Sequence, residues 1–251
     1  MEREIMTGNN ELWRPGNENL ALSRDDVHVW RASLDQAPSR VDYLAQTLSR
    51  DERSRADRFY FEKDKKRFIV GRGLLRTILG YYLDIQPHHV KFSYGSKGKP
   101  ALEVGDEGCR LEFNLSHSQG MAIYAIARDR KIGIDIEHKR TITEVDQLAK
   151  NFFSARENTI LSGLSPSQKQ EMFFHCWTSK EAYLKAIGEG LTKPLDEIEV
   201  SLAIGEPPKL LSIAGDPQEA QRWCLHSLTP AADYVATLAV EGHGWRLSCW
   251  E

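Results

Sequence analysis

The sequence predicts an α+β protein built from two similar lobes in one chain. Segments with helical periodicity are followed by segments with strand-like alternation, and this order occurs twice. The change from the first set to the second falls near Arg128–Lys131, so we expect an N-terminal lobe over residues 25–130 and a C-terminal lobe over residues 131–251. A chain of 251 residues is long enough to give each lobe a core of its own.

Composition narrows the class of protein. A hydrophobic fraction of 41% and a charged fraction of 27% are ordinary for a globular domain. The net charge of −3 argues against a generally basic surface that coats nucleic acid. Residues 40–80 nevertheless hold eleven Lys or Arg against six Asp or Glu. This local surplus could attract a phosphorylated ligand or an acidic protein, or it could be a solvated helix face.

The cysteines and the N-terminal residues predict a cytoplasmic protein. The four cysteines lie far apart and form no C-x-x-C pair, which suggests neither a zinc ribbon nor a disulfide framework. Residues 1–24 are polar, contain no apolar signal region, and are expected to form a flexible extension. No later apolar run approaches membrane-spanning length, so we expect no membrane association.

The first lobe is expected to begin with a short strand and helices. Residues 41–59 follow a helical pattern, and Ser49 three residues before Glu52 forms a capping box that would start a second helix inside this range. Residues 62–83 carry a long apolar stripe at helical spacing. Strands are expected at Val27–Trp30, Val90–Tyr94, Arg110–Asn114, Met121–Ala127 and, opening the second lobe, Lys131–Glu137.

The second lobe repeats this order. Ser154 with Glu157 three residues later predicts a capped helix, and a longer helix over Ser167–Ile187 should end at Gly188. Strands are then expected at Ile198–Leu202, Lys209–Ile213, Trp223–Leu228, Val235–Val240 and Trp245–Cys249.

The segment Ile132–Glu137 is the most informative part of the chain. Three isoleucines alternate with Gly133, Asp135 and Glu137, so the isoleucines share one face of a strand and both carboxylates share the other. Carboxylates this close repel each other unless a cation lies between them, and Mg²⁺ is the usual one. Gly133 would leave space for a pyrophosphate near the backbone. The alternative is a strand end whose acids face water.

The expected helix over Ser167–Ile187 supplies a third carboxylate. Glu181 and Lys185 are four residues apart and therefore lie on one face. They could form an ordinary surface pair. If Asp135 lies nearby, however, Glu181 would complete an oxygen site for Mg²⁺, and Lys180 and Lys185 would meet the remaining charge of a phosphate group.

Two polar loops are expected near this site. One places Lys99 in a turn, and the other places Ser116 and His117 just after a strand. Taken alone, His117 is typical of a hydrogen-bonded structural histidine and Lys99 of a solvated turn residue. Together with Arg67 and Arg55 they would form a set of phosphate contacts.

Six motifs in order carry a resemblance to a known family. They are Phe61-x-x-x-Asp64-x-x-Arg67-Phe68, Gly98-Lys99-Pro100, Asn114-Leu115-Ser116-His117-Ser118, Ile132-Gly133-Ile134-Asp135-Ile136-Glu137, Phe152-Phe153-Ser154-x-x-Glu157 and Trp177-x-x-Lys180-Glu181-Ala182-x-x-Lys185. This set resembles the Sfp-type 4′-phosphopantetheinyl transferases over roughly residues 50–190. The resemblance implies two pseudo-symmetric α+β lobes with coenzyme A bound between them.

The resemblance also implies an activity. Such enzymes move the 4′-phosphopantetheine arm of coenzyme A to a serine of an apo acyl or peptidyl carrier protein and release adenosine 3′,5′-bisphosphate. The implied metal is Mg²⁺, with Mn²⁺ as a possible substitute, and a monomer is expected because both lobes lie in one chain. Which carriers are modified, whether fatty-acid, polyketide or non-ribosomal peptide carriers, stays open.

The resemblance assigns roles to individual residues. The implied roles are metal ligand for Asp135, Glu137 and Glu181, pyrophosphate contact for Lys180 and Lys185, and contact to the 3′-phosphate and nucleotide for Ser116, His117, Lys99 and Arg67, helped by Arg55. Glu181, or a water that it orients, is the first candidate for the base, and Glu157 is the second. Arg53 and Arg55 stand where relatives often have lysine, and residues 1–24 have no clear counterpart.

Two other functions fit part of the pattern. Glu137-His138-Lys139 after Asp135 imitates the acid-x-Lys core of a metal-dependent nuclease, but the weak net charge offers no surface for a duplex. A non-catalytic module that binds coenzyme A or a carrier protein is the second alternative. The intact Asp135, Glu137, Glu181 and Lys185 argue against it.

Overall fold

The computed structural model describes residues 13–16, 20–103, 110–190, 193–203 and 205–251. The first half of the chain folds into β1 (Asp26–Ser33), α1 (Pro38–Thr47), α2 (Arg50–Ala56), α3 (Glu62–Leu83), η1 (Pro87–His89), β2 (Phe92–Tyr94), β3 (Pro100–Leu102), β4 (Leu111–Ser118) and β5 (Met121–Arg128). The second half folds into β6 (Ile132–His138), α4 (Val145–Phe152), α5 (Ala155–Ser162), α6 (Pro166–Ile187), η3 (Leu195–Glu197), β7 (Ile198–Val200), β8 (Leu210–Ile213), α7 (Pro217–Gln221), β9 (Trp223–Leu228), β10 (Tyr234–Glu241) and β11 (Arg246–Trp250).

The same order of elements is used twice. Each half has a strand, three helices, a two-stranded hairpin and an antiparallel pair of strands in this order, and the second half adds the short helix α7 and the strand β11. The third helix, α3 or α6, is 22 residues long in both. The sheets repeat as well, because the order β1-β5-β4 in one corresponds to β6-β10-β9 in the other. The prediction of an α+β protein with two similar lobes is confirmed.

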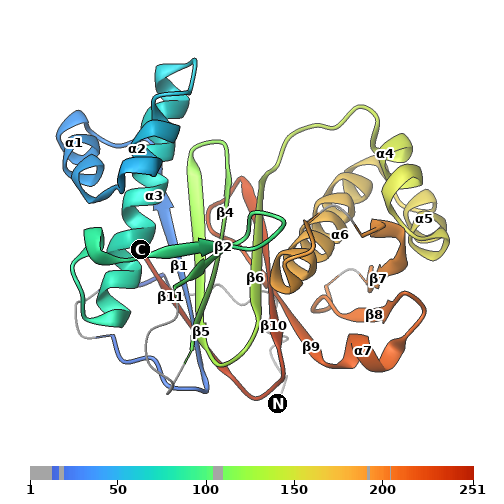
Figure 1. Cartoon of the computed structure of the whole chain (residues 1–251). Helices are drawn as coiled ribbons and strands as arrows, with labels where there is room; N and C mark the ends of the chain where they lie inside the picture. Colours follow the sequence, from blue (N-terminus) through green and yellow to red (C-terminus); the bar gives the residue numbers. More distant parts are fainter. Residues whose placement is uncertain (1–12, 17–19, 104–109, 191–192, 204) are drawn as a thin grey trace, which may run out of the picture.

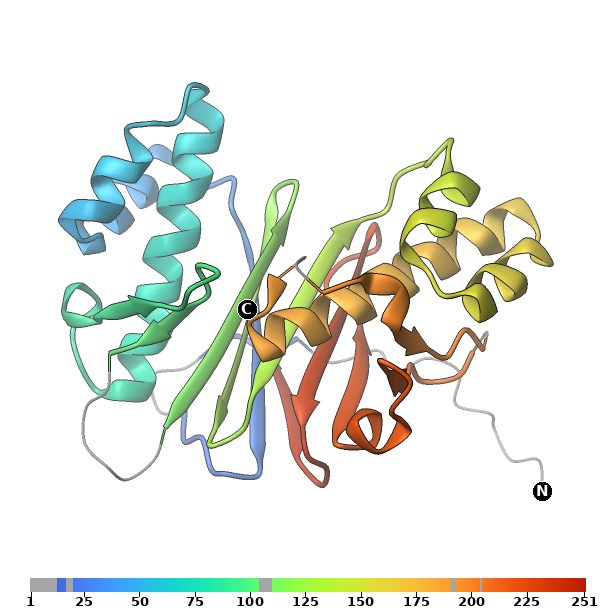
Figure 2. The same ribbon diagram turned by 45° about the vertical axis from the view of Figure 1, so that its right-hand side comes forward.

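The elements stack in four layers (Figures 1 and 2), with the two sheets in the middle and helices outside each of them. Apolar side chains fill all three gaps, between α1–α3 and the first sheet, between the two sheets, and between the second sheet and α6. Ile132, Ile134 and Ile136 face the gap between the sheets and are fully or almost fully buried. The predicted apolar face of β6 is therefore confirmed, and the opposite face meets α6.

Gly133 corrects one expectation from the sequence. A Cβ at this position would lie 2.1 Å from the carbonyl oxygen of Ala182 and 2.3 Å from the nitrogen of Ala186, both in α6. Position 133 requires a glycine because helix α6 packs directly against β6. This packing leaves no space for a pyrophosphate. The close packing brings the polar face of α6 to the two acids of β6.

Local signals in the sequence explain where the helices begin and end. Ser49 and Ser154 each form a capping box with a glutamate three residues later, as predicted. Gly188 ends α6 in the left-handed conformation at a φ of 78°. The elements β3, α4 and α7 were not predicted. Within the described part of the chain, no helix has both the length and the apolar character needed to cross a membrane.

The two ends of the chain differ from their expected places. Strand β11 pairs in parallel with β1, so the last strand of the expected C-terminal lobe completes the sheet of the N-terminal one. Residues 1–12 of the expected extension lie outside the described residues. Within residues 13–16, Arg14 donates to the carbonyl of Cys249 at 3.0 Å and accepts from the nitrogen of Glu251 at 2.9 Å. This part of the expected flexible extension is attached to β11.

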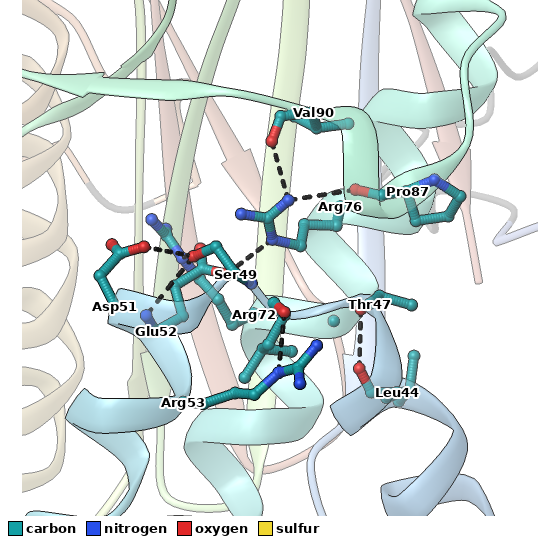
Figure 3. Close-up of polar contacts among 12 residues, drawn as sticks. Leu44, Thr47, Ser49, Asp51, Glu52, Arg53, Arg72, Arg76, Pro87 and Val90 are labelled. Atoms are coloured by element: carbon teal, nitrogen blue, oxygen red, sulfur yellow. Dashed lines mark hydrogen bonds and ion pairs between the residues drawn. The ribbon is translucent and has the colours of Figure 1, made fainter.

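A buried ion network fastens the hairpin β2–β3 to the helices of its lobe (Figure 3). Glu52 of α2 accepts from Arg72 and Arg76 of α3, each at 2.6 Å. The Arg76 guanidinium also donates to the carbonyls of Pro87 and Val90, just before β2. Because all these groups are paired, the network holds α2, α3 and the hairpin in one fixed arrangement.

Candidate active site

The first part of the site joins three elements. Lys185 of α6 donates from Nζ to Oδ1 of Asp135 on β6 at 2.6 Å and to Oγ of Ser116 on β4 at 2.7 Å. The Ser116 hydroxyl in turn donates to the same Asp135 oxygen at 3.0 Å. Asp135 is only 5% exposed. A buried carboxylate is tolerable here because the Lys185 ammonium and a hydroxyl both contact it.

Glu137 lies next along the same face of β6. Its Oε2 accepts from the Ser118 hydroxyl at 3.0 Å and lies 3.7 Å from Nη1 of Arg140. Burial and, after it, the negative charge of Asp135 raise the pKa of Glu137 above its usual range. The two acids therefore share one face, as the alternation predicted, and they repel each other.

Glu181 supplies the third carboxylate. Burial raises the pKa of Glu181, the charges of Asp135 and Glu137 raise it further, and Lys185 acts in the opposite direction. Oε1 of Glu181 and Oδ2 of Asp135 are both buried and accept no hydrogen bond from the residues that the structure describes. Buried carboxylate oxygens without a partner are costly in a folded protein, so each of these atoms is free to bind a further group.

The two lobes meet at β4 and β6, which are edge strands of their sheets. Their contact runs through side chains of one face of β4. Asn114 accepts from the nitrogen of Ile134 at 2.9 Å, Ser116 bonds to Asp135, and Ser118 accepts from the nitrogen of His138 at 3.1 Å. The sequence prediction missed Asn114 and Ser118, because residues 115–118 were expected in a loop. Their alternating polar pattern was the available signal, since it places all three on one face of a strand.

The three carboxylates have the ligand chemistry that a divalent cation requires, but they are not close enough together to bind one. Asp135, Glu137 and Glu181 offer hard oxygen ligands of the kind that Mg²⁺ prefers, and two of the oxygens have no partner. As they lie, however, no three His, Cys, Asp or Glu side chains of the described residues are close enough together to hold a metal ion. The residues therefore fit a metal chemically, and Lys185 supplies the positive charge in this arrangement.

His117 and Arg67 lie on the other side of β4 from the three carboxylates. Because side chains alternate along a strand, His117 points away from Ser116 and Ser118. Burial, followed by the positive charges of Lys185 and Arg67, lowers the pKa of His117. Arg67 of α3 pairs with Asp35 at 2.6 Å and donates to the carbonyl of Gln119 at 2.8 Å. His117 therefore lies in a region made positive by Arg67 and Lys185, and its lowered pKa favours the neutral imidazole.

Lys99 is not part of that region. From the hairpin β2–β3 it donates to the carbonyls of Ala186 at 2.9 Å and Ile132 at 3.3 Å. Burial lowers the pKa of Lys99 to about 8. Ile132 begins β6, about five residues or roughly 15 Å along the strand from the level of His117. The predicted joint grip of Lys99 and His117 on one phosphate is not formed in this structure.

Lys180 and Glu157 occupy the interior of the C-terminal lobe. Nζ of Lys180 lies 2.6 Å from Oε2 of Glu157 and 2.9 Å from the carbonyl of Leu195, and the two side chains are 0% and 1% exposed. Oε1 of Glu157 accepts from the nitrogen of Val200 at 2.8 Å. Contact of Lys180 with a pyrophosphate and proton transfer by Glu157 both require access that these positions lack. The two predicted roles do not fit the structure, and the pair joins α5, α6 and β7.

The early basic residues lie on the outside of α2. Arg53 donates to the carbonyl of Leu48 at 3.0 Å (Figure 3). Arg55 lies over the ring of Phe68, with 5.4 Å from its Cζ to the ring centre. Both are exposed. Among the described residues, Arg55 contacts neither Arg67 nor His117, so its predicted role at a phosphate stays a prediction.

A cavity of about 420 Å³ opens beside the acids. Glu137 and Arg140 line one part of it, and Leu148, Phe173 and Trp177 line another. A second cavity of about 670 Å³ shares Arg140 with the first. The carboxylate cluster therefore borders a space with polar and apolar walls.

Comparison with known proteins gives the family. The family description "4'-phosphopantetheinyl transferase, N-terminal" matches residues 30–129, and "4'-phosphopantetheinyl transferase superfamily" matches residues 131–239. The 4'-phosphopantetheinyl transferase HetI of Nostoc sp. is 48% identical over 238 residues, which are 95% of this chain and 97% of the relative. The transferase Sfp of Bacillus subtilis is 33% identical over 156 residues, 62% of this chain and 66% of the relative.

A more distant relative is the human L-aminoadipate-semialdehyde dehydrogenase-phosphopantetheinyl transferase, 29% identical over 201 residues, 74% of this chain and 65% of the relative. The solved holo-[acyl-carrier-protein] synthase of Thermotoga maritima covers 46% of this chain at 17% identity with a TM-score of 0.34, which is too low to carry an argument. The two matching family descriptions and the 48% identity lead to one conclusion. The chain belongs to the 4′-phosphopantetheinyl transferase family of enzymes.

Proposed function

We propose that this enzyme transfers the 4′-phosphopantetheine group of coenzyme A to a serine of an apo acyl or peptidyl carrier protein, with Mg²⁺ bound, and releases adenosine 3′,5′-bisphosphate. The observation that carries the proposal is the cluster at the meeting of the lobes. There a lysine, Lys185, contacts the buried Asp135, and the carboxylates of Glu137 and Glu181 lie close by. One oxygen of Asp135 and one of Glu181 accept no hydrogen bond from the described residues. Phosphoryl transfer needs such charge compensation and alignment more than it needs a covalent group.

The site residues would act as follows. Asp135, Glu137 and Glu181 would hold Mg²⁺, which supplies charge neutralisation at the pyrophosphate when it is bound. Lys185, which contacts Asp135 in this structure, would turn its ammonium to the pyrophosphate. The carrier serine oxygen then forms a bond to the β-phosphorus. The bond from this phosphorus to the bridging oxygen breaks, and the electron pair leaves with adenosine 3′,5′-bisphosphate.

Glu181 is our candidate for the base that accepts the serine proton. Its Oε1 is buried and accepts no hydrogen bond from the described residues, so this oxygen is available to take the proton, directly or through a water. Glu137, whose pKa is raised, borders the cavity and would face the incoming carrier. Glu157 is set aside because Lys180 and Val200 occupy its oxygens in the interior.

Coenzyme A would lie across the lobe junction. Arg67, with the neighbouring His117 imidazole as a hydrogen-bonding partner, would suit its 3′-phosphate. The cavity with Phe173 and Trp177 suits the pantetheine arm, which has both amide and apolar parts. Lys99 and His117 would contact different parts of coenzyme A. Lys99 lies at the start of β6, whereas His117 of β4 lies level with its end. Membership of the family speaks against the nuclease alternative.

The test is product release. The protein is incubated with coenzyme A and Mg²⁺, with and without an apo carrier protein, and adenosine 3′,5′-bisphosphate is measured by chromatography. We expect release only when the carrier is present. Release without a carrier would indicate a hydrolase, and no release with any class of carrier would favour the non-catalytic binding module.

A further inference from the structure

The Ser118 hydroxyl donates one hydrogen bond and accepts another where the two lobes meet. Its oxygen accepts the backbone N–H of His138 at 3.1 Å, and its only proton goes to Oε2 of Glu137 at 3.0 Å. A serine hydroxyl has one proton to donate, and here the N–H of His138 approaches the oxygen, so the proton is directed to the carboxylate. The hydroxyl therefore has a fixed orientation.

Ser116 shows the same arrangement two residues earlier. It accepts from Lys185 at 2.7 Å and donates to Asp135 at 3.0 Å. Two serines of β4, both from the N-terminal lobe, thus each give their single proton to one acid of β6. The carboxylates come from the part of the chain that matches one family description, and the hydroxyls come from the part that matches the other.

We propose that Ser118 is a positioning residue that fixes the Glu137 carboxylate for the cation, so that β4 of one lobe completes the metal site of the other. The inference rests on the proposed function for the existence of that cation. It concerns an orientation, because Ser118 would contact neither the metal nor the substrate.

The surroundings of Glu137 show why it needs such a partner. Asp135 repels this carboxylate, and its side chain is half-buried, so it has room to move. Arg140, largely exposed, lies 3.7 Å from Oε2 of Glu137, and the positive charge of Lys185 also acts on this carboxylate. Without the Ser118 hydroxyl, the carboxylate would turn outward to Arg140 and away from Asp135.

The experiment measures metal binding directly. Mn²⁺ is titrated into the protein in the presence of coenzyme A, and free Mn²⁺ is followed by electron paramagnetic resonance, with a blank that contains coenzyme A alone. We compare the wild-type protein, Ser118→Ala, Ser118→Thr, Glu137→Gln and the double variant Ser118→Ala/Glu137→Gln. Ser162→Ala is the matched control, because Ser162 is exposed and, among the described residues, its hydroxyl bonds only to the Thr159 carbonyl of its own helix.

We expect Ser118→Ala to weaken Mn²⁺ binding about tenfold, the lower end of what loss of a hydrogen bond to a metal ligand does. Ser118→Thr keeps the hydroxyl and should restore binding to within about threefold of wild type. In the double variant, Ser118→Ala should add less than about twofold to the loss from Glu137→Gln, because the serine acts through that glutamate.

Any of three results in the variants would overturn the inference. They are unchanged Mn²⁺ affinity in Ser118→Ala, equal loss in Ser118→Thr and Ser118→Ala at matched melting temperatures, and additive losses in the double variant. Absence of Mn²⁺ binding in the wild-type protein would also overturn it. If Mn²⁺ binding behaves as expected but no phosphopantetheine is transferred, the proposed function fails while the role of Ser118 stands.

Discussion

The buried pair of Lys180 and Glu157 gives a prediction that separates a loss of stability from a loss of catalysis. Replacing Lys180 by Met removes the ammonium and leaves the Glu157 carboxylate in the interior, where its remaining partners are the backbone nitrogens of Ser154 and Val200. Removing one partner of a buried ion pair costs about 3–5 kcal/mol. For a chain of this size, about 2–4 °C of melting temperature corresponds to each kcal/mol, so we expect a fall of roughly 6–20 °C.

The assay combines thermal unfolding with turnover at a temperature where the variant is folded. The double variant Lys180→Met/Glu157→Gln, which contains no buried charge, should recover most of the melting temperature. Lys169→Met on the same helix is the matched control, since its pair with Asp146 lies at the surface and should change stability by less than about 1 kcal/mol. A Lys180→Met variant with wild-type melting temperature and turnover reduced a hundredfold or more would refute the structural role and return Lys180 to the pyrophosphate.

Three further predictions follow from the geometry. Glu181→Gln removes the charge and nearly all the basicity, so coenzyme A should still bind in calorimetry while transfer falls on the order of a hundredfold; near-normal transfer would contradict both roles of Glu181. Gly133→Ala should separate α6 from β6 and lower the melting temperature strongly. Gly71→Ala, whose added Cβ would lie 3.4 Å from its nearest neighbour, should change the melting temperature little. Equal effects of the two substitutions would contradict the close packing at Gly133. Lys99 has a pKa of about 8 in the folded chain and 10.5 as its ordinary value, so the unfolded chain binds more protons between these values and stability rises with pH there. In urea unfolding, the stability of the wild type relative to Lys99→Met should therefore increase from pH 7.5 to pH 9.5, and a decrease would contradict the burial of Lys99.

Local chemistry made much of this fold predictable. Capping boxes at Ser49 and Ser154 depend on residues three positions apart, and both formed as expected. The alternation of Ile132–Glu137 depends only on the two-residue period of a strand, and it placed Asp135 and Glu137 on one face. The contact of Lys185 with Asp135 agrees with the expectation that α6 faces these acids.

The structural features that the sequence did not predict depend on long-range packing. The helical pattern places Lys180 and Lys185 on α6, but the packing of α5 and η3 against this helix decides that Lys180 is covered and meets Glu157 and the Leu195 carbonyl. Gly133 could mean open space or close approach, and the position of α6 decides between them. The pairing of β11 with β1 joins residues more than two hundred positions apart, which no local signal specifies.

We propose that the carboxylate cluster between the lobes catalyses a metal-dependent transfer to a carrier protein. This proposal is tested most directly by the intact mass of an apo carrier protein after incubation with coenzyme A and Mg²⁺, using wild-type enzyme and Asp135→Ala side by side, each with and without excess chelator. We predict a mass increase of one phosphopantetheine group with the wild-type enzyme alone, and its loss with chelator or in the variant. Full modification by the Asp135→Ala variant, or by the wild-type enzyme in excess chelator, would contradict the account.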